Sequence, residues 1–225
     1  MNPLAAGTLF LVLSCLLSGP VLALDQVPAR AAPSTQPRPS QLNSERIRAQ
    51  FGSYGIDILQ QDMQTRVSSL YSMDQGQKIT RTLAVVMYAD EIPSPILAEH
   101  QIIAGGGSIG EVFKANGWSV EKKSRYFGAL PASPDYAEIY ALMGGIQPME
   151  LATHVYELSV CKAGRCLVYA TIAEVHHPDY FDQALLEETW NAGNILPEPG
   201  QTEARDLMNA VQQQLIGMAR QHSGR

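Results

Sequence analysis

A pair of cysteines between two apolar runs constrains the fold of this chain more than any other feature. Residues 157–161 and 166–170 are rich in residues that favour strands, and the Lys-Ala-Gly-Arg between them contains the glycine typical of a hairpin turn. Cys161 and Cys166 would face each other at the last rung before the turn, where paired strands bring Cβ atoms near the distance that a disulfide requires. The pattern predicts an antiparallel hairpin over 153–175, closed by a Cys161–Cys166 disulfide.

Two other uses of a cysteine pair fit less well. A structural zinc site needs further ligands at a regular spacing, and no second cysteine pair is present. A redox-active pair is typically Cys-x-x-Cys, whereas four residues separate these two cysteines. We therefore expect a structural disulfide of modest stabilising effect, because it closes a short loop.

The first 23 residues indicate that the chain is exported, which would place the disulfide in an oxidising compartment. Residues 1–24 carry no charged side chain, and the nearly uninterrupted apolar run 4–17 ends at Gly19-Pro20. The short residues up to Ala23 predict a signal peptide over 1–23, although the first basic residue is Arg30 and no positive segment precedes the apolar run. A protein exported in this way would be periplasmic or secreted in a bacterium.

Two alternatives to a cleaved signal peptide stay open. Residues 4–24 could remain as a membrane anchor, because about 20 apolar residues span a bilayer. The run around Cys15 vaguely resembles a lipoprotein site, but Leu13 is too large for the position that it occupies in that motif. We interpret Cys15 as part of a discarded signal.

The remaining sequence divides into three parts. Residues 24–41 are rich in Pro, Ala, Ser and Gln without apolar periodicity, which predicts a disordered linker. Residues 42–180 are predicted to form one domain of a size that a single hydrophobic core can serve. Residues 181–225 are expected to form C-terminal helices that pack on this domain or extend it.

The apolar periodicity inside the domain predicts hairpins with helices inserted between the strands. Strands are expected at 56–64, 66–72, 79–88 and 120–127 besides the 153–175 hairpin, and helices at 44–54, 96–103, 109–117, 137–143, 182–190 and 202–222. Antiparallel hairpins combined with such helices indicate an α+β fold, with an antiparallel sheet of about six strands and helices packed on one side.

Charge and ligand spacing exclude several classes of function. The net charge is −6, from 22 acidic against 16 basic residues, so no basic face for nucleic acid is expected. Glu174, His176 and His177 are types of residue that bind zinc, but adjacent histidines on a strand point to opposite sides. We interpret them as a solvated strand end and predict neither a metal nor a cofactor.

The order and spacing of several elements resemble the chorismate lyase family and, more distantly, the ligand-sensing domains of bacterial transcription regulators that share its fold. The resemblance rests on the run 66–71, Gly76, the run 107–110 with Phe113, and the hairpin 164–167. It covers about residues 44–180 and implies a six-stranded antiparallel sheet that encloses a small-molecule pocket.

The resemblance also implies roles for individual residues. In the family, an arginine on the first core strand and two backbone amides at a helix entrance hold carboxylates; these positions match Arg66 and Ile109-Gly110. The family's catalytic glutamate falls on Thr171, whose hydroxyl does not titrate near neutrality. Glu174 lies three positions further on and should point to the opposite face of the strand, so it could replace that glutamate only if the alignment is shifted. Glu174 is therefore kept as the alternative catalytic candidate, and no catalytic residue is assigned.

The glycine-rich run before the predicted helix 109–117 has two further interpretations. Ser108 is a favourable N-cap, and free N–H groups at a helix start could bind an anion, so Ser108, Ile109 and Gly110 are candidate ligand-binding residues. Residues 106–110 also match the Gly-x-Ser-x-Gly motif of serine hydrolases, with Ser108 as nucleophile. That motif requires a strand directly before it, whereas 96–103 is predicted to be helical.

Two arginines in apolar strands need partners, because an uncompensated buried charge is costly. Arg66 is interpreted as a pocket residue and Arg81 as structural, while Asp57, Asp62 and Glu157 remain open as protein partners for either.

Together these patterns predict an exported module, without catalytic activity, that binds a small carboxylated or aromatic ligand or a protein partner of unknown identity. The main alternative is a lyase that acts on chorismate or a related aromatic carboxylate; a serine hydrolase is less favoured. A third possibility is a structural envelope protein whose pocket is filled by side chains.

Overall fold

The computed structural model describes residues 41–190 together with Thr202, Asp206 and Asn209. The predicted signal peptide 1–23, most of the linker 24–41 and most of the predicted helix 202–222 lie outside these residues. The three described residues of that helix are helical and exposed. No helix in the described part of the chain is long and apolar enough to cross a membrane.

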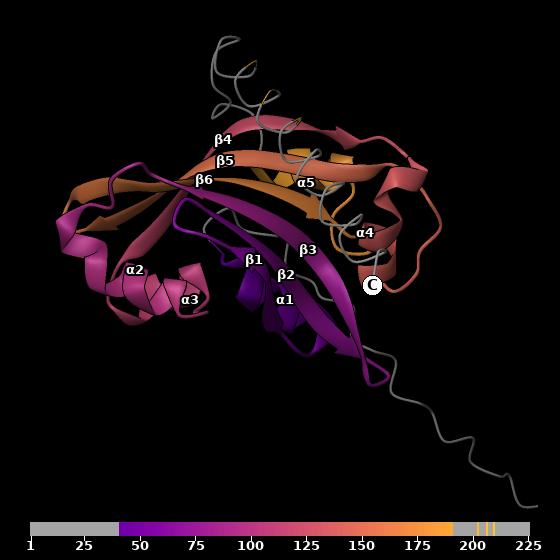
Figure 1. The fold of residues 1–225 in the computed structure, drawn as a ribbon, viewed down its shortest axis with the longest axis horizontal. Helices are drawn as coiled ribbons and strands as arrows, with labels where there is room; N and C mark the ends of the chain where they lie inside the picture. The colour runs from indigo at the N-terminus through magenta and orange to yellow at the C-terminus, as the bar shows by residue number, and fades with distance from the viewer. Residues whose placement is uncertain (1–40, 191–201, 203–205, 207–208, 210–225) are drawn as a thin grey trace, which may run out of the picture. The chain divides into compact units, whose positions relative to one another are not determined.

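Six antiparallel strands form one sheet, in the order β1-β2-β3-β6-β5-β4 (Figure 1). This confirms the predicted α+β class with a six-stranded antiparallel sheet. The strands are β1 (Gly55–Gln61), β2 (Thr65–Asp74), β3 (Gln77–Tyr88), β4 (Ser119–Leu130), β5 (Leu151–Lys162) and β6 (Arg165–His176).

Helices cover both faces of this sheet, although unequally. The helices are α1 (Asn43–Phe51), α2 (Leu97–Ala104), α3 (Ile109–Ala115), α4 (Ala137–Leu142) and α5 (Gln183–Trp190), with short 3-10 turns at Ser94–Ile96 and Pro134–Tyr136. Apolar residues of α1, α2, α3 and α5 share one core with the sheet, whereas α4 belongs to a second core on the opposite face. Figure 1 shows α4 apart from the group formed by α1, α2 and α3.

The position of α4 follows from strands that are apolar on both faces. In β3, Ala84 and Val86 belong to the core under α1 to α3, while Leu83 and Val85 belong to the core under α4. Successive side chains of a strand point to opposite faces, so a continuous apolar run needs cover on both sides. The expectation that helices pack on one side therefore holds for four of the five helices named above.

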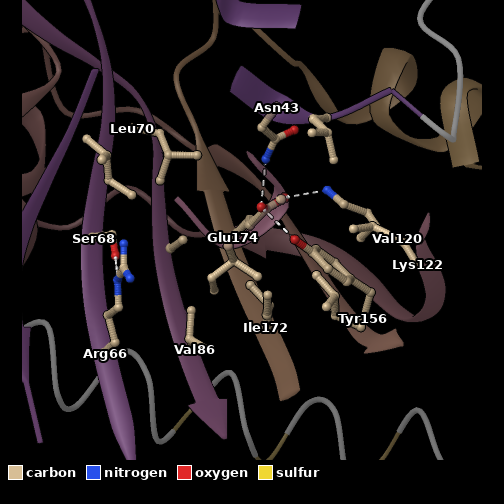
Figure 2. Close-up of a pocket in the computed structure, with 16 residues that line it drawn as sticks. Asn43, Arg66, Ser68, Leu70, Val86, Val120, Lys122, Tyr156, Ile172 and Glu174 are labelled. Carbon is tan, nitrogen blue, oxygen red and sulfur yellow. Dashed lines mark hydrogen bonds and ion pairs between the residues drawn. The ribbon is translucent and has the colours of Figure 1, made fainter. Parts of the chain in front are cut away.

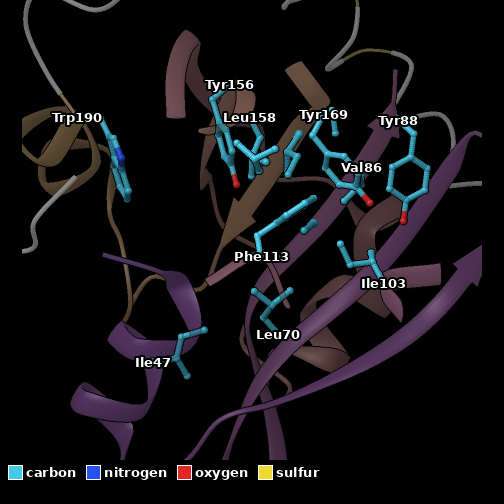
Figure 3. Packing of buried hydrophobic residues seen from close by; sticks show 14 of the residues in the cluster. Ile47, Leu70, Val86, Tyr88, Ile103, Phe113, Tyr156, Leu158, Tyr169 and Trp190 are labelled. Atoms are coloured by element: carbon cyan, nitrogen blue, oxygen red, sulfur yellow. The ribbon is translucent and has the colours of Figure 1, made fainter. Parts of the chain in front are cut away.

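The larger core is unusually aromatic. Figure 3 shows Phe113 of α3 beside Tyr169 of β6, and their ring centroids are 4.9 Å apart in an edge-to-face arrangement. Tyr88 and Tyr169 form a second edge-to-face pair at 5.6 Å. Such pairs add to the stabilisation that burial provides. Through these two pairs, α3 and β3 both pack against Tyr169 of β6.

The predicted disulfide is present, although not at the rung that the sequence indicated. Cys161 pairs with Cys166 in the sheet register, with Cα atoms 4.0 Å apart, and one further pair, Lys162–Arg165, follows before the turn. The turn therefore has only two residues, Ala163 and Gly164, both with positive φ (51° and 78°). Two successive positive φ values are typical of a type I′ hairpin.

The first helix is shorter than predicted because of one glycine. The helix expected over 44–54 ends at Phe51, and Gly52 adopts the left-handed conformation (φ 79°) while its N–H donates to the Arg48 carbonyl. Glycine takes this C-cap conformation without the strain that a Cβ imposes. The chain then turns at once into β1.

A candidate ligand-binding cavity

A cavity of about 70 Å³ lies between the sheet and the start of α1 and α3. A single water needs roughly 10–15 Å³ of comparable space, so the cavity has room for several water molecules. The sheet contributes Leu70, Val86 and Ile172 to its wall, as Figure 2 shows, and Leu42 and Ile109 close it from the helical side. The wall is therefore mainly apolar.

Arg66 of β2 brings a buried positive charge to this wall. The residue is 1% exposed. Its Nε donates to Ser68 Oγ at 2.9 Å, and its Nη1 donates to the carbonyl oxygens of Ile103 (3.0 Å) and Gly107 (2.9 Å). Its Nη2 is buried without a hydrogen-bond partner. Arg66 thus holds the α2–α3 connection and keeps one nitrogen unpaired.

No carboxylate of the described residues forms an ion pair with Arg66, and the three that the sequence left open are engaged elsewhere. Asp57 pairs with Lys78 at 2.6 Å, Asp62 accepts from the backbone N–H groups of Gln64 and Thr65, and Glu157 pairs with Arg125 at 2.5 Å. The hydrogen-bond acceptors of Arg66 are therefore neutral. This is an unusual state for a buried guanidinium, because buried charges are normally paired.

The hydroxyl of Tyr88 is a second buried polar group near Arg66. Burial raises the pKa of the Tyr88 phenol, and the Arg66 guanidinium opposes this rise. Hydrogen bonding with Arg66 and Tyr169 also lowers this pKa, although no contact of Tyr88 Oη has the geometry of a normal hydrogen bond. The neighbouring Tyr169 hydroxyl is hydrogen-bonded with His100 Nδ1 at 3.0 Å. Arg66 and Tyr88 are thus interacting neighbours, and neither Arg66 Nη2 nor Tyr88 Oη has a hydrogen bond of normal geometry.

Glu174 of β6 lies elsewhere in the cavity wall, and its two oxygens differ. Oε1 accepts from Asn43 Nδ2 at 2.7 Å and from the Tyr156 hydroxyl at 2.8 Å. Oε2 is buried and accepts no hydrogen bond, although it lies 3.8 Å from Lys122 Nζ and 3.7 Å from His176 Nε2. Figure 2 shows Asn43, Lys122 and Tyr156 converging on this carboxylate. Burial, reinforced by the nearby carboxylate, raises the pKa of Tyr156 well above its usual value.

Lys122 of the edge strand β4 points into the cavity instead of into solvent. Its side chain is 8% exposed, and Nζ lies 4.4 Å from the centroid of the Tyr156 ring and 5.5 Å from that of Trp190. Burial lowers the pKa of Lys122 to about 8, although Glu174 opposes the shift. The sequence reasoning missed this residue. The signal for Lys122 was its position two residues after the apolar Val120, because residues two apart on a strand point to the same face.

The structure contradicts the interpretation of His176 and His177 as a solvated strand end. They are 0% and 4% exposed. His176 Nδ1 is hydrogen-bonded with Thr82 Oγ1 at 3.0 Å, and burial lowers the pKa of His176 to about 4. On the other side of the strand, His177 Nε2 lies 3.2 Å from the Met143 carbonyl. The aromatic side chains of the connection after β6, Tyr180 and Phe181, cover His176.

Within the described part of the chain, one cluster has the composition of a metal site. It consists of Glu121, Cys161 and Cys166, whose ligand atoms all lie within 4.8 Å of one another. The two sulfurs are bonded to each other, and metal binding by cysteine needs free thiolates. The cluster therefore does not fit a metal while the disulfide is intact.

The residues that the family resemblance singled out fall into two groups. Ile109 and Gly110 line the cavity with Arg66, and a Cβ on Gly110 would lie 2.7 Å from Leu42 Cδ2, so a larger residue there would force the side chain of Leu42, the N-cap residue of α1, to shift. Thr171 does not line the cavity. Glu174, three residues further along the strand, does.

Ser108 occupies the N-cap position of α3 but makes no capping hydrogen bond with its side chain. Its Oγ instead accepts from the Tyr54 hydroxyl at 3.2 Å. Helix α2 ends at Ala104, so the loop that carries Ser108 follows a helix. The strand that a Gly-x-Ser-x-Gly nucleophile requires is missing at this place.

A scan against protein-family models gives no match, and a search of curated proteins finds none that is significantly similar. The resemblance to the chorismate lyase family therefore stays a prediction. A six-stranded α+β sheet does not by itself specify a function, whereas the residues that line the cavity define its chemistry.

Proposed function

We propose that this chain is an exported protein that binds a small carboxylate with an apolar, aromatic body, and that Arg66 holds the carboxylate. The observation that carries the proposal is the buried Arg66 guanidinium, which has neutral acceptors and an unpaired Nη2. A bound carboxylate would neutralise this charge and accept the free N–H groups, and charge-assisted hydrogen bonds of this kind are among the strongest in proteins.

The rest of the cavity favours an apolar ligand body. Leu70, Val86 and Ile172 are branched aliphatic side chains between Arg66 and the polar group around Glu174. Small-molecule sites are commonly apolar with a few polar groups that fix orientation. An aromatic acid would place its carboxylate at Arg66 and its ring against these side chains.

Export is part of the proposal. The Cys161–Cys166 disulfide is compatible with an oxidising compartment such as the periplasm. Intact mass measurement of the protein recovered from outside the cytosol distinguishes the two fates of its N-terminus. Loss of residues 1–23 would support a signal peptide, whereas retention would support an anchor formed by 4–24.

The test of ligand binding is calorimetric titration of benzoate into the full chain and into Arg66→Lys. Lysine keeps the charge but loses the fork of N–H donors, so we expect benzoate affinity to fall by about 1.5–3 kcal/mol, or roughly 10- to 150-fold. Arg81→Lys is the matched control, because Arg81 is also a buried sheet arginine but donates to Ser72 and lies 3.8 Å from Asp179, outside the cavity. Equal affinity of the two variants would refute the role of Arg66.

One observation favours a second candidate, a lyase that acts on chorismate or a related aromatic carboxylate. Glu174 lines the cavity and keeps Oε2 free of hydrogen bonds, so a carboxylate able to exchange a proton is available where Thr171 is not. Release of pyruvate from chorismate by the full chain, and its loss in Glu174→Gln, would support this candidate. If the chain bound benzoate but released no pyruvate, the non-catalytic proposal would stand.

A further inference from the structure

The amine of Lys122 is placed as a reactive group would be. Lys122 and its neighbour Lys123 lie on the same edge strand, yet Lys123 is exposed and Lys122 lines the cavity. The alternation of side chains along β4 separates them. A ligand inside the cavity would meet the Lys122 amine and could not meet the Lys123 amine.

Among the described residues, nothing accepts a hydrogen bond from Lys122 Nζ. Its nearest anion is Glu174 Oε2 at 3.8 Å, and its other close neighbours are the faces of Tyr156 and Trp190. Such surroundings disfavour the ammonium form relative to the neutral amine. With a pKa of about 8, about a tenth of Lys122 is neutral at pH 7, a far larger fraction than for an exposed lysine.

Glu174 is oriented as a proton acceptor for this amine. Asn43 and Tyr156 both donate to Oε1, which fixes the plane of the carboxylate. Oε2 then lies between Lys122 Nζ at 3.8 Å and His176 Nε2 at 3.7 Å, and it accepts no hydrogen bond. Nucleophilic lysines in proteins are typically desolvated in this way and have a neighbouring base.

We propose that Lys122 forms an imine with ligands that carry an aldehyde or ketone group at the end opposite a carboxylate, while Arg66 holds that carboxylate. This proposal rests on the carboxylate binding proposed above and adds a chemical class of ligand. Lys122 thereby becomes the residue that selects carbonyl compounds among small aromatic acids.

The step is balanced without any oxidant or reductant. The ammonium of Lys122 gives one proton to Glu174, and the nitrogen lone pair then attacks the carbonyl carbon while the carbonyl π electrons move to oxygen. Proton transfer from nitrogen to that oxygen gives a neutral carbinolamine. Glu174 returns its proton to the hydroxyl, which leaves as water, and the nitrogen lone pair forms the C=N bond of a protonated imine.

The experiment uses 4-carboxybenzaldehyde as the probe, with the full chain at pH 7 and sodium cyanoborohydride to trap the imine as a stable amine. Peptide mapping by mass spectrometry locates the adduct. We expect Lys122 to be labelled at least about tenfold faster than Lys123, because its neutral fraction is larger. Excess benzoate should suppress this labelling, and benzaldehyde, which lacks the carboxylate, should label Lys122 more slowly.

Two lysine variants and one glutamate variant complete the test. Lys122→Arg should abolish the fast adduct, whereas Lys123→Arg, the matched control, should keep it. Glu174→Gln removes a charge that raises the pKa of Lys122, so the rise of the pH–rate profile should move to lower pH. The labelling rate on the plateau above that rise should nevertheless fall, because the group that returns a proton to the leaving hydroxyl is lost; an unchanged plateau rate would overturn the proposed role of Glu174.

The outcomes separate this proposal from the one it rests on. If benzoate binds in calorimetry but the adducts fall on exposed lysines, the imine proposal is wrong and carboxylate binding stands. If neither benzoate nor the aldehyde binds, both proposals fall. Labelling of Lys122 that benzoate cannot suppress would also overturn the imine proposal, because the aldehyde would then reach the amine without its carboxylate being held.

Discussion

The Tyr156 hydroxyl is the most direct test of the polar group in the cavity. Tyr156 is 2% exposed and donates to Glu174 Oε1 at 2.8 Å. Tyr156→Phe keeps the ring, and therefore its packing, but removes this donor. A hydrogen bond to a charged acceptor contributes about 1.5–3 kcal/mol, so the free energy of unfolding at pH 7 should fall by that amount.

Tyr140→Phe is the matched control for this change. Tyr140 is 3% exposed, and its hydroxyl donates to the uncharged Met149 carbonyl at 3.0 Å. A neutral hydrogen bond contributes about 0.5–1.5 kcal/mol. The Tyr140 hydroxyl also accepts a long hydrogen bond from the Ser133 N–H at 3.4 Å, so Tyr140→Phe loses two neutral hydrogen bonds. A larger cost of Tyr156→Phe would therefore reflect the charge of its acceptor.

Urea denaturation of the full chain, followed by tryptophan fluorescence, gives both free energies if the m-value is unchanged. A double-mutant cycle of Tyr156→Phe with Glu174→Gln then isolates the coupling between the two side chains. The reasoning would be refuted if Tyr156→Phe cost no more than Tyr140→Phe, or if the cycle were additive within about 0.5 kcal/mol.

Three further predictions concern acid stability, the disulfide and the contact between α1 and α3. Burial lowers the pKa of His176 from 6.5 to about 4. Below pH 6.5 the unfolded chain therefore binds a proton at this histidine more readily than the folded chain does. The free energy of unfolding should fall by up to about 3 kcal/mol between neutral pH and pH 4. His176→Gln should reduce this loss in urea denaturation at pH 7 and pH 4.5, and an unchanged loss would contradict it. Reduction of Cys161–Cys166 should lower the free energy of unfolding by about 2 kcal/mol, whereas two free thiols in the exported protein, detected by mass spectrometry without reductant, would speak against the bond. Gly110→Ala should cost about 1–3 kcal/mol by overpacking in thermal and urea denaturation, while Gly105→Ala, whose Cβ would come no closer than 3.4 Å to its neighbours, should cost much less; equal costs would count against a steric role of Gly110.

Much of the fold was predictable because its signals are local. The turn glycines Gly76 and Gly164 and the alternation of the strands predicted two hairpins, and the spacing of Cys161 and Cys166 predicted their bond. The errors in element ends were small and also local in origin. Gly52, for example, ends α1 earlier than apolar periodicity alone indicated.

The candidate site was less predictable, because both faces of the central strands are buried. The sequence correctly placed Thr171 and Glu174 on opposite faces of β6, but it did not show which face would enclose the cavity. Lys122 and Asn43 were missed for a related reason. Their role depends on the approach of β4 and the start of α1 to Glu174, which lies 131 residues from Asn43 along the chain.

The sequence by itself determined the antiparallel hairpins, the disulfide and the class of fold, because turns, alternation and short loops depend on residues that are neighbours in the chain. It also pointed to Arg66 as a pocket residue. Only the tertiary structure decided that Arg66 lacks a carboxylate partner and that Lys122 and Glu174 share its cavity. The pairing and desolvation of buried charges depend on which distant segments pack together, and local sequence patterns do not specify that packing.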